Sequence, residues 1–71
     1  MTDWPKRDQV DPNDLLGASE VLELVGWNHR ASISDAEERL DFPPPIRTIR
    51  GARLWHQEDI RRWITLHPRH P

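Results

Sequence analysis

Two blocks of apolar residues recur at helical spacing between positions 18 and 40. The first block predicts a helix over 18–25, because its apolar residues lie three and four positions apart and therefore share one face. These residues are Val21, Leu24 and Val25. Gly17 can serve as the N-cap of this helix, and Gly26 follows it where a helix end favours a left-handed residue.

The second block predicts a helix over 29–39, with Asn28 placed to cap its N-terminus. Its apolar residues are Ile33, Ala36 and Leu40. Two short helices joined by a turn of about three residues that contains a glycine are typical of a helix-turn-helix. A helical hairpin that binds nothing is the alternative, and this stretch alone favours neither.

The spacing changes after the second helix, where residues 47–55 predict a short β-hairpin. Three prolines at 43–45 end the helix because proline cannot continue it, and Phe42 before them is expected in the core. Gly51-Ala52 fits a two-residue type II′ turn with glycine at the first central position. That register makes three cross-strand pairs: Ile49–Leu54, Thr48–Trp55 and Arg50–Arg53. Like charges directly opposite each other are unfavourable unless an anion lies between them.

A third helix is predicted over 58–66. Glu58 and Asp59 lie in its first turn, which the helix macrodipole favours. The residues expected on its buried face are Ile60, Trp63 and Ile64. The predicted fold class is therefore mostly α with a small β-hairpin.

The length of 71 residues predicts one small domain, which we expect over 15–66. Residues 1–14 are charged and contain prolines but no apolar period, which predicts a flexible acidic tail, and residues 67–71 form a short C-terminal tail. The chain has no cysteine, which excludes a disulfide framework and Cys-based metal sites. It shows no membrane-spanning run and no signal-peptide core, so we expect a cytoplasmic protein that does not bind a membrane.

Charge is distributed unevenly along the chain. Residues 1–45 hold four Lys/Arg and ten Asp/Glu, a net charge of −6. Residues 46–71 hold six Arg and two acidic residues, a net charge of +4. Arginine is the better bidentate ligand for phosphate, so the second part predicts an anion-binding surface rather than charge scattered for solubility.

The sequence shows no common catalytic motif. It has no Cys nucleophile, no Gly-rich phosphate loop and no Gly-x-Ser-x-Gly motif. Among its histidines, His67 and His70 are three apart but flank Pro68 in the C-terminal tail, which makes a metal site there improbable. A domain of this size rarely encloses a catalytic pocket. We therefore expect no enzyme activity, no metal and no cofactor.

The exposed start of the second helix carries short polar side chains and an arginine, which are groups that recognition helices present to base edges. These candidate contacts are Asn28, His29, Arg30, Ser32 and Ser34. The later part of the same helix holds Asp35, Glu37 and Glu38, which would repel phosphates. Only the N-terminal end of the helix is therefore expected to enter a DNA groove.

Five motifs follow one another over 15–66: Leu15-Leu16-Gly17-x-x-Glu20-Val21, Leu24-Val25-Gly26, Asp41-Phe42-Pro43-x-Pro45, Arg53-Leu54-Trp55 and Asp59-Ile60-x-x-Trp63. Their order and spacing resemble the excisionase and AlpA group of small winged helix-turn-helix proteins, distant relatives of the MerR DNA-binding domain. The resemblance implies that the second helix enters the major groove and that the hairpin, or wing, contacts the backbone or the adjacent minor groove. The wing residues that it implies are Arg47, Arg50 and Arg53. The acidic middle of the second helix departs from the commonly basic recognition helix of that group.

These observations predict sequence-specific binding of double-stranded DNA, by an excisionase (a recombination directionality factor) or a small transcription regulator. One such domain covers little DNA, so strong binding would need self-association along the DNA or a partner such as an integrase or recombinase. The alternative is a protein-interaction module on the same scaffold, in which acidic surfaces bind a basic partner and DNA contact is weak or absent.

Overall fold

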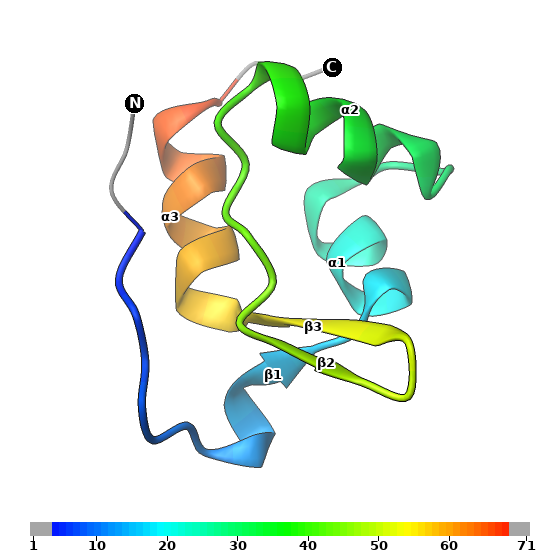
Figure 1. Cartoon of the computed structure of the whole chain (residues 1–71). Helices are drawn as coiled ribbons and strands as arrows, with labels where there is room; N and C mark the ends of the chain where they lie inside the picture. The colour runs from blue at the N-terminus through cyan, green and yellow to red at the C-terminus, as the bar shows by residue number, and fades with distance from the viewer. Residues whose placement is uncertain (1–3, 69–71) are drawn as a thin grey trace.

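The computed structural model describes residues 4–68, which form a small α+β domain with three α-helices and a three-stranded antiparallel sheet (Figure 1). The elements in chain order are a 3₁₀ turn η1 (Pro12–Asp14), β1 (Leu15–Leu16), α1 (Ala18–Val25), α2 (Ala31–Arg39), β2 (Arg47–Ile49), β3 (Ala52–His56) and α3 (Gln57–Leu66). The three predicted helices and the hairpin are all present. Strand β1 is additional, because two residues are too few to show the alternation that marks a strand.

Helices α1 and α3 lie where the apolar spacing predicts them. Gly17 is the N-cap of α1, and Gly26 ends the helix with a left-handed φ of 92°. Helix α3 begins at Gln57, one residue before the predicted start. The Nδ1 atom of His56 caps it by accepting a hydrogen bond of 3.1 Å from the Glu58 N–H.

Helix α2 begins at Ala31, two residues after the predicted start, and Asn28 does not cap it. Its N-cap residue is Arg30, which makes no side-chain capping hydrogen bond. The Ser32 N–H instead donates to the His29 carbonyl at 3.0 Å, which is the three-residue spacing of a 3₁₀ turn. Backbone carbonyls thus satisfy N–H groups in the first turn of α2 without a side-chain cap, so the prediction for Asn28 is wrong.

The sheet has the strand order β1-β3-β2, and the register of its hairpin differs from the predicted one. The β2–β3 pairs are Arg47–Leu54, Thr48–Arg53 and Ile49–Ala52. The central turn residues are therefore Arg50 and Gly51, and both have positive φ, 52° and 82°. Positive φ at both positions is the property of a type I′ turn, whose twist matches that of the strands. The predicted type II′ turn is wrong, and Arg50 does not face Arg53.

The core of the described residues lies between the helices and the inner face of the sheet. Its buried hydrophobic residues are Val21, Val25, Ile33, Ala36, Phe42, Trp55, Ile60 and Trp63. The predicted burial of Phe42 is confirmed, but Leu24 is 36% exposed. Leu22 packs against the core in its place, because α1 contacts both β3 and α3 and turns the 21–22–25 face toward them.

The segment that joins α2 to the hairpin is held by three tryptophan side chains. The indole N–H groups of Trp63, Trp4 and Trp55 donate to the carbonyls of Leu40 (2.9 Å), Asp41 (3.3 Å) and Pro43 (3.1 Å) respectively. An extended, proline-rich segment has no secondary-structure partners for its carbonyls, and these donors supply them. The tryptophans thus anchor the segment after α2 to α3, to the N-terminal segment and to β3.

The N-terminal segment packs along α3, which differs from the flexible tail predicted over 1–14 (Figure 1). Nη2 of Arg7 lies 2.9 Å from Oδ1 of Asp59, a carboxylate that is buried at the start of α3. The guanidinium of Arg62 lies 5.7 Å from the ring centroid of Trp4. A buried carboxylate needs a partner for its charge, and Arg7 provides one from the N-terminal segment. Residues 1–3 and 69–71, parts of the two predicted tails, lie outside the described residues.

Candidate nucleic-acid interface

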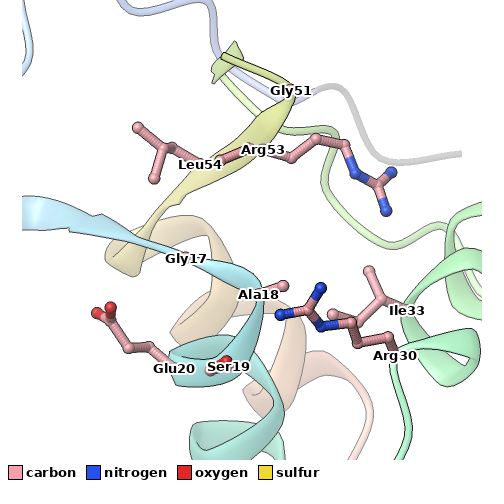
Figure 2. A pocket seen from close by; sticks show the side chains of 10 residues that line it. Gly17, Ala18, Ser19, Glu20, Arg30, Ile33, Gly51, Arg53 and Leu54 are labelled. Atoms are coloured by element: carbon pink, nitrogen blue, oxygen red, sulfur yellow. The ribbon is translucent and has the colours of Figure 1, made fainter. Parts of the chain in front are cut away.

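A hollow of about 390 Å³ lies between the N-terminal end of α1, the start of α2 and the tip of the hairpin (Figure 2). Residues 17–20 line it from α1, Arg30 and Ile33 from α2, and residues 51–54 from the hairpin. In Figure 1 the start of α2 and the tip of the hairpin lie on the same side of the molecule. The fold therefore brings three segments that are distant in sequence to one surface, which we call the α1–α2–hairpin hollow.

The hollow is lined by two arginines, of which Arg53 is paired with Glu37. Figure 2 shows the guanidinium of Arg30 extending from α2 toward Ala18 at the start of α1, with Glu20 directed away from it. Arg30 is exposed and has no ion-pair partner among residues 4–68. Gly17 offers no side chain to cap the first N–H groups of α1, which carry the positive end of the helix macrodipole. The hollow is thus suited to an anion.

Arg53 crosses the hollow from β3 to α2. Its Nη1 atom lies 2.9 Å from Oε1 of Glu37, and its guanidinium lies 5.2 Å from the ring centroid of Trp55. The side chains of Arg53 and Glu37 are 40% and 25% exposed. Arg53 is therefore engaged inside the protein, unlike Arg30.

The structure separates the predicted contacts of α2 into two groups. Ser34 follows Arg30 by four residues and precedes Glu37 by three, so all three share the side of α2 that faces the hairpin. Ser32 lies on the other side of α2, where it lines a separate hollow of about 200 Å³ with Trp27. Asn28 and His29 are exposed in the turn before α2.

The hairpin arginines also point in different directions. Successive side chains of a strand alternate between its two faces, and cross-strand partners share a face. Thr48 and Arg53 are partners on the face toward α2, whereas Arg47 pairs with Leu54 on the opposite face. Arg50 is exposed in the turn at the tip. Of the eight predicted site residues, Arg30 and Arg53 line the hollow, and Arg50 is next to Gly51, which also lines it. Asn28, His29 and Ser34 lie near it at the start of α2, whereas Ser32 and Arg47 are on other faces.

Two features of the site are not predicted by the sequence: the ion pair of Glu37 and the position of the start of α1. Glu37 is expected there as one of three acidic residues that repel phosphate, but in the structure it is paired with Arg53. The start of α1 is expected only as a helix N-terminus, and it lines the hollow. A signal for Glu37 does exist, since positions 30, 33 and 37 share a helix face, which places Glu37 beside whichever element Ile33 packs against.

Comparisons with protein-family models, curated proteins and solved structures found no match for this chain. Within residues 4–68 no group of three or more His, Cys, Asp or Glu side chains is placed to hold a metal ion. No helix in the same range is long and apolar enough to cross a membrane. The chemistry of the site is therefore inferred from its residues and their arrangement.

Proposed function

We propose that the protein binds double-stranded DNA as a winged helix-turn-helix protein, with α2 as the recognition helix and the β2–β3 hairpin as the wing. The observation that carries this proposal is the α1–α2–hairpin hollow, at which Arg30, the uncapped start of α1 and Gly51 of the hairpin tip meet, with Arg50 next to Gly51. Arginine and helix N-termini are the groups that hold DNA phosphates.

The N-terminal turn of α2 enters the major groove in this proposal. Asn28, His29, Arg30 and Ser34 supply the hydrogen-bonding groups that read base edges or fix the register on the backbone. Arg50 contacts the backbone from the tip of the hairpin. Asp35 and Glu38 stay outside the groove, because their charges would repel phosphates.

The number of arginines at the hollow sets the expected salt dependence. Arg47 faces away from α2, so Arg30 and Arg50 are the exposed arginines on this side of the hairpin. Neutralising roughly 2–3 phosphates gives a slope of log K against log salt of about −2 to −3. A single domain of this kind covers about 600–1,000 Å², so useful affinity requires copies side by side or a partner such as an integrase or recombinase. We propose a role as an excisionase or a small transcription regulator in the cytoplasm.

A protein-interaction module on the same scaffold is the second candidate. Asp35 and Glu38 are exposed on α2 and have no ion-pair partner in the described part of the chain. A basic partner protein would complement these charges. In this case DNA would bind weakly or not at all, which the experiment below distinguishes.

Binding is tested by fluorescence anisotropy of labelled duplexes at several salt concentrations. Arg50→Ala is expected to weaken binding about equally on all sequences and to reduce the salt slope by about one. Arg30→Ala or Ser34→Ala is expected to change which sequences bind best, as measured by selection from a random duplex pool. Arg61→Ala is the matched control, because Arg61 is an exposed arginine on α3 that does not line the hollow. Absence of binding at low salt, or an equal loss in Arg61→Ala, contradicts the proposal.

A further inference from the structure

We propose that the Glu37–Arg53 ion pair sets the position of the hairpin against α2, and that Arg53 is a positioning residue rather than a phosphate ligand. This inference rests on the proposed DNA binding. It concerns how the hairpin is oriented relative to α2. It also gives a role to Glu37, an acidic residue of a kind that is unexpected in a DNA-binding helix.

The guanidinium of Arg53 is held on two sides. Glu37 accepts a hydrogen bond of 2.9 Å from Nη1, and the ring of Trp55 lies 5.2 Å from the guanidinium carbon. Trp55 is itself completely buried, and its indole N–H bonds to the Pro43 carbonyl. A charge-assisted hydrogen bond together with a cation–π contact on a fixed ring gives Arg53 a defined orientation.

The hairpin has few other means of keeping its place beside α2. All three residues of β2 are exposed, and β3 packs against β2, β1, α1 and α3. The tip, with Arg50 and Gly51, is exposed as well. The direct polar contact between the hairpin and α2 within residues 4–68 is the ion pair of Arg53 with Glu37.

Positioning and simple electrostatics predict opposite effects when Glu37 loses its charge. Removing a negative charge near bound DNA strengthens binding if charge alone matters. If the ion pair positions the hairpin, the same substitution weakens binding, because the tip with Arg50 no longer has a fixed distance from α2. The sign of the change therefore separates the two accounts.

The chain supplies a matched control for this comparison. Glu38 is adjacent to Glu37 on α2 and is exposed, without an ion-pair partner among residues 4–68. Glu37→Gln and Glu38→Gln thus make the same charge change at neighbouring positions. Only the first of them removes the negative charge of the ion pair with the hairpin and so weakens that contact.

Binding of a duplex pool by the full chain is measured for Glu37→Gln, Glu38→Gln, Arg53→Gln and the exchanged pair Glu37→Arg with Arg53→Glu. We expect Glu37→Gln to bind about three- to fivefold more weakly at an unchanged salt slope, and Glu38→Gln to bind as well as the parent or better. Arg53→Gln should weaken binding without reducing the slope, and the exchanged pair should recover at least half of the loss in free energy. Tighter binding by Glu37→Gln, a slope reduced by about one in Arg53→Gln, or no recovery in the exchanged pair overturns the proposal.

A second measurement needs no DNA and keeps the two proposals separate. Residual dipolar couplings of the amides at 47–53, measured relative to those of α2, report the hairpin orientation in the free protein. We expect Glu37→Gln to change or average them while Glu38→Gln leaves them unchanged; unchanged couplings in Glu37→Gln refute positioning. Failure of the parent chain to bind any duplex refutes the proposed function instead, and these couplings still decide whether the pair orients the hairpin.

Discussion

At the scale of single residues, the pair formed by Arg7 and Asp59 connects the N-terminal segment to α3. Asp59 is 3% exposed, and the side chain of Arg7 is 24% exposed where it reaches the carboxylate. Glu58 lies at a longer distance, 3.7 Å from the same Nη2 atom, and is mostly exposed. Arg7 therefore offsets mainly the cost of burying the charge of Asp59, not that of Glu58.

Replacement of Arg7 should destabilise the domain through this carboxylate. Arg7→Ala leaves Asp59 buried without its cation, and we expect the free energy of unfolding to fall by about 2–3 kcal/mol. Lys6→Ala removes an exposed charge one position earlier and should change it by less than about 0.5 kcal/mol. Urea denaturation followed by tryptophan fluorescence measures both variants. Equal stability of the two would show that the N-terminal segment does not hold Asp59 in solution.

At the scale of elements, the hairpin turn holds Arg50, a proposed DNA contact, in an unfavourable backbone conformation. Arg50 has a φ of 52°, a left-handed conformation that costs a non-glycine residue about 1–2 kcal/mol. Asparagine adopts this conformation more easily, and Asn-Gly is the preferred pair for a type I′ turn. An arginine at this position is thus unfavourable for folding, and we infer that its side chain is used for binding.

Stability and DNA affinity should therefore change in opposite directions in Arg50→Asn. We expect the free energy of unfolding to rise by about 0.5–1 kcal/mol, since the strain is relieved. Affinity for DNA should fall several-fold, because the charge at the tip is lost. Thermal unfolding and fluorescence anisotropy on the same preparation measure the two quantities. Gly51→Ala is the comparison, and it should lower stability because alanine is strained at a φ of 82°.

The elements differ in how far the sequence predicts them. Helix α1 is predicted to the residue, because the apolar spacing and the two flanking glycines agree. The hairpin register is not, because glycine suits the first central position of a type II′ turn as well as the second position of a type I′ turn, and Arg50 in a left-handed conformation is a rare choice beside it. The two residues of β1 form a strand only through pairing with β3, which no local pattern reveals.

At the scale of the whole molecule, the uneven charge of the chain is rearranged by folding. Arg30 comes from the acidic part of the sequence, yet it lies beside the basic hairpin at the α1–α2–hairpin hollow. The proposed contacts Arg30, Ser34 and Arg50 follow from the sequence, because exposed polar residues on the predicted elements suffice to select them. Two features could not be predicted in this way. Ser32 and Arg47 face away from the hollow, and Glu37 pairs with Arg53. Both depend on the rotation of α2 and on the hairpin register, which packing decides.

The central claim is that duplex DNA binds at the α1–α2–hairpin hollow, and a backbone NMR titration at low salt tests it most directly. A duplex pool of mixed sequence is sufficient, because non-specific contacts to phosphates are strong under these conditions. The account predicts the largest chemical-shift changes at residues 17–20, 28–34 and 50–53, with small changes along the exposed face of α3 that carries Arg61 and Arg62. No changes, or changes confined to that face of α3, would contradict it.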